Sequence, residues 1–131
     1  GYIGQIEDPT CDNQHYRRVL FTAKHSQLVL MNLKPGEEIG EEVHGMDQFI
    51  RFEEGEGTVV LDGEKHAVSD GFAVVIPAGT RHNVVNSGKT AALKLYSLYS
   101  PPEHKDGIIH KTKQEADADH DHHFDGRTSM K

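Results

Sequence analysis

The sequence predicts an all-β fold, a sandwich or barrel of short strands. Between residues 28 and 100, short runs rich in β-branched and aromatic residues alternate with turn signals about every 8 to 12 residues. The same range lacks a helical apolar period of useful length. Together these observations favour one β-barrel or sandwich over any mixed fold.

Each expected strand is a short apolar run that ends at a turn. Pro35-Gly36 ends the first run, and Pro77-Ala78-Gly79 ends a later one. Asp62-Gly63 joins two further runs in the pattern of a tight hairpin. The expected strands are residues 28–33, 48–52, 58–61, 64–68, 72–76, 83–85 and 93–99.

The chain divides into three parts within one domain. Its 131 residues suit a single hydrophobic core. Residues 1–27 form a mixed, polar N-terminal segment in which we expect edge strands. Residues 28–100 form the barrel, and residues 101–131 form a C-terminal extension.

The C-terminal extension changes character along its length. Turn residues frame two histidines in residues 101–113, so we expect this part to be ordered and to pack across the mouth of its own barrel or a partner subunit's. A short helix is expected within residues 114–121. Beyond about residue 114 we expect little contribution to stability. The histidine-rich residues 120–123 fit a flexible, solvated end, with metal binding as the alternative.

Composition excludes several classes of function. The formal charge of −7, from 14 basic and 21 acidic residues, argues against a nucleic-acid surface, which requires a basic patch. No apolar run approaches the roughly 20 residues of a membrane span. Cys11 is the single cysteine and no signal peptide is visible, so we expect a cytoplasmic protein without an intrachain disulfide. The expected partner is a small-molecule ligand or substrate.

The stretch "DGFAVVIPAGTRHNVVN", residues 70–86, carries a spaced set of turn and polar residues. This spacing resembles the second motif of the cupin superfamily at every named position. Those positions are Gly71, Pro77, Gly79, His82 and Asn86. Five spaced positions that match in a strand-turn-strand setting make this a fairly specific resemblance.

The stretch "PGEEIGEEVHGMDQFIRFEEGEG", residues 35–57, resembles the first cupin motif in its spacing. With Gly36 as the first glycine, Glu42 stands at the first histidine position, His44 at the second, Gln48 at the glutamate and Gly55 at the last glycine. The resemblance covers roughly residues 28–100. It implies a conical barrel of about six to eight strands, a double-stranded β-helix or jelly roll, that holds one divalent metal ion.

Strand geometry supports the same residues as metal ligands. Glu42 and His44 share one face because side chains alternate along a strand. A turn at residues 45–47 would return Gln48 on a facing strand, and His82 would come from a distant one. Imidazole and carboxylate ligands suit manganese, zinc, iron or nickel, with geometry deciding among them. Each residue has an alternative: a structural histidine, a solvated glutamate, or a glutamine that orients water or substrate.

The four candidates keep the charge of the usual cupin set. The resemblance implies a usual set of three histidines and one glutamate. Here the carboxylate stands at the first histidine position, as Glu42, and an amide stands at the glutamate position, as Gln48. We therefore expect weaker or more selective metal binding. Two histidines and one carboxylate with open positions also resemble the facial triad of non-haem iron enzymes. The other acids of the stretch are expected on the surface: Glu37, Glu38, Glu41, Glu53, Glu54 and Glu56.

The function expected from this resemblance is metal-dependent chemistry on a small polar substrate. The chain looks like mannose-6-phosphate isomerase-like cupins, which implies aldose–ketose isomerisation of a sugar or sugar phosphate, with catalytic residues unassigned. Only Arg51 and Arg81 lie in the barrel as candidates for a phosphate. Two alternatives stay open: a metal-dependent dioxygenase or carbon–carbon lyase, and a non-catalytic module that binds a carbohydrate or other small ligand. We expect a homodimer formed through edge strands.

Overall fold

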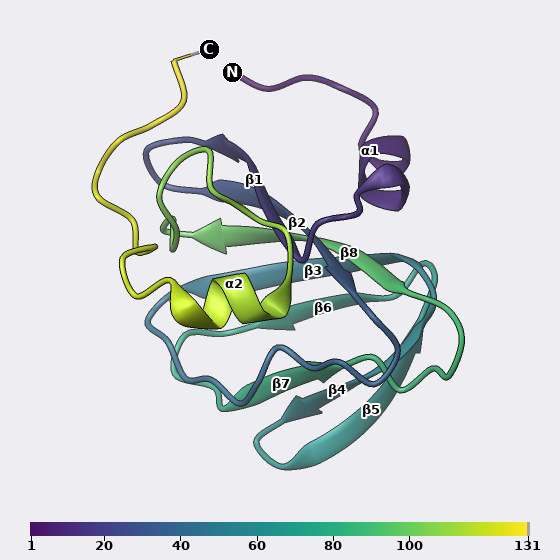
Figure 1. The fold of residues 1–131 in the computed structure, drawn as a ribbon. Helices are drawn as coiled ribbons and strands as arrows, with labels where there is room; N and C mark the ends of the chain where they lie inside the picture. Colours follow the sequence, from purple (N-terminus) through teal and green to yellow (C-terminus); the bar gives the residue numbers. More distant parts are fainter. Residues whose placement is uncertain (131) are drawn as a thin grey trace.

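The computed structural model describes residues 1–130, which fold into two antiparallel β-sheets (Figure 1). The six-stranded sheet has the order β6-β3-β8-β2-β1-β9, and the three-stranded sheet has the order β5-β4-β7. The strands are β1 (Arg17–Thr22), β2 (Gln27–Leu33), β3 (Asp47–Glu54), β4 (Glu56–Leu61), β5 (Glu64–Ser69), β6 (Ala73–Ile76), β7 (His82–Val85), β8 (Leu93–Ser100) and β9 (Ile109–His110). Every strand predicted from the sequence is present within two residues of its expected bounds, so the all-β prediction is confirmed.

The core lies between the two sheets. Residues on alternating positions of the central strands point inward, as the period of a β-strand requires. Ile50 and Phe52 on β3 are fully buried, as is Leu95 on β8. On β8 the interior positions are therefore Leu95, Ser97 and Tyr99.

The hairpin between β4 and β5 follows from its two turn residues. Asp62 has φ 50° and Gly63 has φ 83°, so both central residues adopt the left-handed conformation that a tight hairpin turn requires. Leu61 pairs with Glu64 across this turn. The Asp-Gly signal was therefore read correctly.

The N-terminal segment contributes both a strand and a helix. Residues 1–27 supply a strand, as expected, but β1 is not at the edge of the sheet: it pairs with β2 on one side and with the edge strand β9 on the other. The helix α1 (Glu7–Asp12) was not expected, because residues 7–12 contain one proline and carry no apolar period. None of the helices in the described part of the chain has the length and apolar character needed to span a membrane.

The C-terminal extension folds back onto the barrel further than predicted. The helix α2 (Lys113–Ala118) begins at Thr112, whose side chain accepts a hydrogen bond from the Glu115 N–H, and it buries Ala116. In Figure 1, α2 lies beside the strands of the barrel rather than away from them.

The residues beyond α2 also make defined contacts with the chain. The Lys105 N–H donates to the carbonyl of His122, and the Phe124 N–H donates to the carbonyl of Glu103, both at 2.8 Å. These contacts argue against the expectation that residues beyond about 114 contribute little to stability, which the truncation below tests. The composition is polar, but these polar groups pair with the preceding 103–110 segment instead of with water.

Gly55 is the residue whose replacement should disturb the fold most. It has φ +95°, and a Cβ there would lie 2.3 Å from the carbonyl oxygen of Ala92. Gly55→Ala should lower the free energy of unfolding by about 3 kcal/mol or more, because it adds a backbone clash to left-handed strain. Gly63→Ala is the control: its φ is also positive at +83°, but nothing lies near the new Cβ. It should cost only about 1–2 kcal/mol. Equal losses for the two variants in urea denaturation would contradict this account.

Ending the chain after Gln114 tests the contribution of the last residues. This truncation removes most of α2, the pairing of residues 122–124 with residues 103–105, and the Asp119 partner of His110. We expect the melting temperature to fall by about 5 °C or more. Ending the chain after Gly126 keeps these contacts and should cost much less. A melting temperature within about a degree of the full chain after the first truncation would restore the original expectation.

Candidate metal centre

Three of the candidate ligands are held together by backbone pairing. The segment that follows β2 runs antiparallel to β7, and Glu42 and His82 exchange two backbone hydrogen bonds, of 2.8 and 3.0 Å. This pairing fixes Glu42 and, two residues later on the same face, His44 beside the first residue of β7. The two motifs thus meet although about 40 residues separate them in the chain.

The side chains of these residues converge on one point. One potential ligand atom from each of Glu42, His44 and His82 lies within 4.8 Å of the others. The two imidazole rings are 4.7 Å apart between centroids, in an edge-to-face arrangement. His82 is buried, whereas Glu42 and His44 are half-buried. The described residues therefore offer two nitrogens and one carboxylate to a single ion.

Second hydrogen bonds determine which histidine nitrogens face this point. Nδ1 of His44 lies 3.0 Å from the carbonyl oxygen of Met46, and Nδ1 of His82 lies 2.8 Å from that of Thr80. A carbonyl oxygen only accepts, so each Nδ1 carries the proton and each Nε2 presents a lone pair. This is the arrangement by which proteins orient metal-binding imidazoles.

Gln48 completes the set as a fourth acceptor. Its amide nitrogen donates to Ser97 Oγ at 3.1 Å and to the Tyr99 hydroxyl at 3.2 Å. Its Oε1 therefore turns toward His44, where it lies 3.3 Å from Nε2. With the proton of His44 on Nδ1, two acceptors face each other across this distance, and a cation between them would satisfy both.

This donor set fits a divalent metal. The neutral imidazoles, the Glu42 carboxylate and the Gln48 amide oxygen together carry one negative charge and leave coordination positions free. Nitrogen and oxygen donors in this ratio suit zinc, manganese, iron or nickel, and do not choose among them. Glu42, His44, Gln48 and His82 would be the residues that hold the ion.

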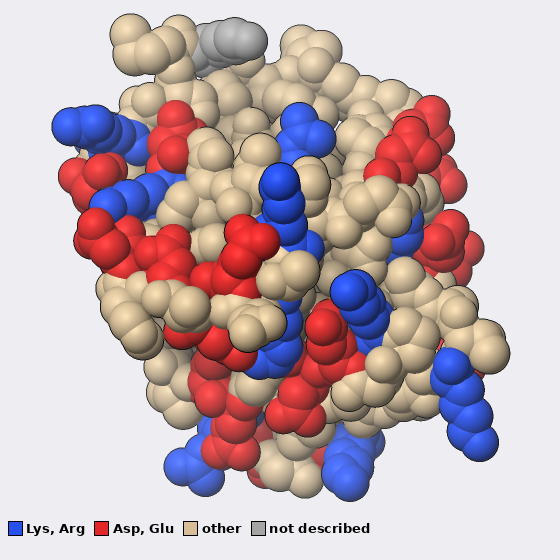
Figure 2. Space-filling view, in the orientation of Figure 1, with Lys and Arg blue, Asp and Glu red and all other residues tan. Residues whose placement is uncertain are grey.

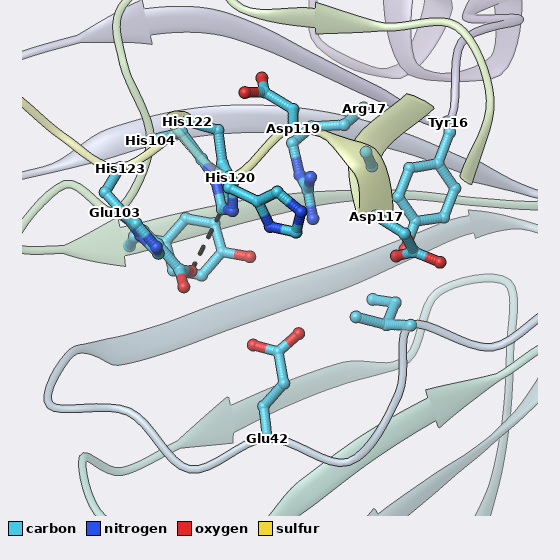
Figure 3. Close-up of a pocket in the computed structure, with 13 residues that line it drawn as sticks. Tyr16, Arg17, Glu42, Glu103, His104, Asp117, Asp119, His120, His122 and His123 are labelled. Atoms are coloured by element: carbon cyan, nitrogen blue, oxygen red, sulfur yellow. Dashed lines mark hydrogen bonds and ion pairs between the residues drawn. The ribbon is translucent and has the colours of Figure 1, made fainter. Parts of the chain in front are cut away.

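A pocket of about 310 Å³ opens above the metal centre and shares Glu42 with it. Figure 3 shows Glu42 on one side and the side chains of the C-terminal extension on the other. On the face shown in Figure 2, acidic side chains gather over α2, which forms part of the rim. The lining also includes Tyr16, Arg17, Ile39, Tyr99, Glu103, His104, Ala116, Asp117, Asp119, His120, His122 and His123.

The histidines above the pocket form a connected group. Nδ1 of His104 lies 3.0 Å from Nδ1 of His122, and Nε2 of His110 lies 2.9 Å from Asp119 Oδ2. Burial, reinforced by the Arg17 charge, lowers the pKa of His104 to about 2, so this ring stays neutral. The pKa of His122 is also lowered, mainly by burial. His104 and His122 thus favour the neutral, hydrogen-bonding form of the ring over positive charge.

Glu103 and Tyr99 are protonatable groups in the same pocket. Burial raises the pKa of Glu103, and the nearby Glu42 carboxylate raises it further. The Tyr99 hydroxyl is fully enclosed, and burial raises its pKa well above the usual value. Glu103 is consequently held nearer to the range in which a carboxyl can both take up and release a proton.

The structure places the remaining sequence candidates away from this pocket. Arg81 pairs with Glu41 at 3.1 Å on the exposed surface, and Arg51 pairs with Glu53 at 2.9 Å. Glu53 was expected on the surface, and this expectation is wrong: the side chain is buried, and its ion pair with Arg51 compensates its charge. The other acids of that stretch are exposed or half-buried.

Sequence reasoning missed the pocket residues outside the barrel. Arg17, Glu103 and His104 have no motif around them. The pairing of β9 with β1 sets the neighbours of Arg17, and hydrogen bonds to the Gln27 side chain position Glu103 and His104. The one available signal was the frame of turn residues in 101–113, which predicted packing across the barrel mouth.

Comparison with known proteins gives the family. The cupin domain model matches residues 29–99, more than half of the chain. The chain belongs to the cupin family. This confirms the resemblance read from the two motifs and the barrel fold that it implied; the narrower likeness to mannose-6-phosphate isomerase-like proteins is not shown.

Relatives of this cupin match over most of its length. It is 45% identical over 127 residues to the uncharacterized protein YrkC of Bacillus subtilis, which covers 92% of this chain and 68% of YrkC. It is 46% identical over 113 residues to the uncharacterized protein L612 of Acanthamoeba polyphaga mimivirus, 82% of this chain and 70% of L612. The crystal structure of BH2720 from Bacillus halodurans superposes with a TM-score of 0.87 at 45% identity, over 90% of this chain and 94% of that one. These similarities extend beyond the matched domain, so they include part of the extensions that build the pocket.

Gln48→Glu tests whether this cupin uses Gln48 as a ligand. A carboxylate at this position should tighten divalent metal binding by about tenfold, because it adds a negative charge next to the ion. Ser97 and Tyr99 can turn their hydroxyls to donate to it. Competition with a chelator measures the change, and Gln14→Glu, an exposed position, controls for the added charge. Equal metal retention in the two variants would mean that Gln48 faces the substrate instead.

Proposed function

We propose that this cupin is a metal-dependent isomerase that moves a proton between adjacent carbons of a small hydroxy-carbonyl substrate. The observation that supports this best is one pocket that contains both Glu42 of the candidate metal centre and the half-buried carboxyl of Glu103. A bound divalent metal would act as a Lewis acid toward a carbonyl oxygen. A sugar or sugar phosphate, as in mannose-6-phosphate isomerase-like proteins, is the substrate class that this chemistry suits.

Glu103 is the residue best suited to move the proton. Its raised pKa, caused first by burial, favours exchange of a proton with a carbon or oxygen of the substrate. The Glu103 N–H lies 3.2 Å from Gln27 Oε1, and the Phe124 N–H donates to the Glu103 carbonyl, so the backbone of the residue is fixed from both sides. A fixed backbone places the carboxyl relative to the substrate more accurately than a mobile loop would.

The enclosing residues would limit the entry of water. Tyr99 and Ile39 line both the pocket and the small cavity beneath it that adjoins Gln48 and His82. Tyr16 lies in the wall nearest α2, and burial raises its pKa to about 12, so its hydroxyl stays protonated as a hydrogen-bond donor. A substrate held here would contact both ends of the pocket.

A second candidate function is a metal-dependent dioxygenase or carbon–carbon lyase. It is favoured by the set of two imidazoles and one carboxylate in Glu42, His44 and His82, which resembles the facial triad of non-haem iron enzymes. The cytoplasmic location and the homodimer stay predictions beside either function.

Solvent deuterium exchange tests the isomerase directly. The protein, loaded with Mn²⁺, would be incubated in D₂O with aldohexoses and their 6-phosphates, and deuterium at the carbon next to the carbonyl would be followed by NMR. Glu103→Gln should lower the rate by about 100-fold or more, because it removes the group that carries the proton. Glu115→Gln, an exposed position on α2, is the matched control and should retain the rate.

The outcomes separate the three functions. Metal-dependent exchange that requires Glu103 supports the isomerase. Oxygen uptake by the Fe²⁺-loaded protein, with no exchange, favours the dioxygenase. Ligand binding without any turnover favours the binding module.

A further inference from the structure

Arg17 is a buried cation that no carboxylate contacts in the described part of the chain. It lies at the start of β1, its side chain lines the pocket, and only 7% of the residue is exposed. The salt bridges among residues 1–130 do not include it. Buried charges in proteins are normally paired, so this arginine is an exception.

The guanidinium also keeps most of its hydrogen-bonding capacity. Among the described residues its one hydrogen bond runs from Nη1 to His110 Nδ1, at 3.1 Å, and Nε has no partner. An arginine has five N–H donors. Its carbon lies 5.3 Å from the centre of the Tyr16 ring, which holds the planar group in place without using these donors.

The carboxylates around the pocket are engaged elsewhere. Asp119 accepts a hydrogen bond from the other ring nitrogen of His110, so one imidazole separates it from Arg17. Asp117 pairs with Lys113 at 3.0 Å, and Glu42 belongs to the metal centre. Glu103 faces His104, with 3.8 Å between Oε2 and Nε2.

His104 is a second buried group with an unused atom. The residue is 2% exposed, and its Nε2 has no hydrogen-bond partner within the described chain. Figure 3 shows His104 and Arg17 on the same side of the pocket, opposite Glu42. A ligand group that enters between them can accept hydrogen bonds from the free donors of Arg17 and lie next to the unpartnered Nε2 of His104.

We infer that Arg17 forms a subsite for an anionic oxygen group, a carboxylate or a phosphate, on the substrate of this cupin. The planar guanidinium binds such groups through two parallel hydrogen bonds. The substrate would lie with its acidic end at Arg17 and its reactive end toward Glu42. The pocket volume of about 310 Å³ suits a molecule the size of a sugar acid or sugar phosphate. This inference rests on the proposed function for the reactive end and adds the identity of the other end.

Calorimetric titration of the metal-loaded full chain tests the subsite. The probes are D-glucuronate, D-glucose 6-phosphate and neutral D-glucose, so that the carboxylate and the phosphate are compared with the same ring without an anion. At least one of the two acids should bind about tenfold tighter than glucose or better, because a charged hydrogen bond of this kind is strong. Which acid binds more tightly identifies the anionic group.

Variants of two adjacent arginines separate the subsite from the general charge. Arg17→Gln should weaken binding of the preferred acid by about tenfold or more and leave glucose binding unchanged. Arg18→Gln, on the exposed face of the same strand, loses the same charge and should bind the acid as the natural chain does. Arg17→Lys keeps the charge but lacks the paired donors of the guanidinium, so its affinity for the acid should lie between those of the natural chain and Arg17→Gln. It also replaces Arg17→Gln as the test if that variant has a much lower melting temperature.

Three results would overturn the subsite: equal affinity for glucose and both acids, equal loss in the Arg17 and Arg18 variants, or no binding of either acid. The proposed isomerase fails separately. If the acid binds in an Arg17-dependent manner but no deuterium exchange follows, the subsite stands and the isomerase does not. Deuterium exchange on glucose 6-phosphate whose rate and substrate affinity are unchanged in Arg17→Gln would give the reverse conclusion: the isomerase would stand and the subsite would not.

Discussion

The pairing of residues 36–42 with β7 is the constraint on which the rest of this site depends. The Gly36 N–H donates to the carbonyl of Asn86, and the Ile39 N–H donates to that of Val84. The side-chain amide of Asn86 then donates to the carbonyls of Leu33 and Ala91, which ties the pair to the strands on either side. A shift of one residue in this register would turn Glu42 and His44 away from His82. The geometry of the candidate metal centre therefore depends on this strand pairing and not on the conformation of any one loop.

The same backbone determines which ring nitrogen of each histidine carries the proton. The Met46 and Thr80 carbonyls accept hydrogen bonds from Nδ1 of His44 and His82, so the Nε2 lone pairs face inward. Glu42, His44, His82 and Gln48 therefore present acceptors toward one region, and a cation bound there would satisfy them together. Ser97 and Tyr99 add to this by directing the amide nitrogen of Gln48 away from the centre.

The barrel and the convergence of Glu42, His44 and His82 were predictable because their signals are local. Glycines with positive φ, such as Gly55 and Gly79, and the Pro77 turn mark where strands end, and spacing between turns fixes which residues face inward. The pocket was not predictable in this way. Arg17 enters it only because the two residues of β9 pair with the start of β1, a contact between positions that are 93 residues apart. Neither partner belongs to a periodic pattern that would indicate burial.

The contacts of the histidine-rich extension could not be predicted from composition. Composition describes how a segment behaves in water and does not show which groups it contacts in the fold. Residues 120–123 read as a solvated tail, but His122 is adjacent to His104 and carries the backbone carbonyl that Lys105 binds. Burial lowers the pKa of His104 to about 2 and also lowers the pKa of His122. Two neutral imidazoles can lie near Arg17 without repelling it, whereas two lysines could not. The extension therefore covers the pocket while leaving the guanidinium without a carboxylate partner among the described residues.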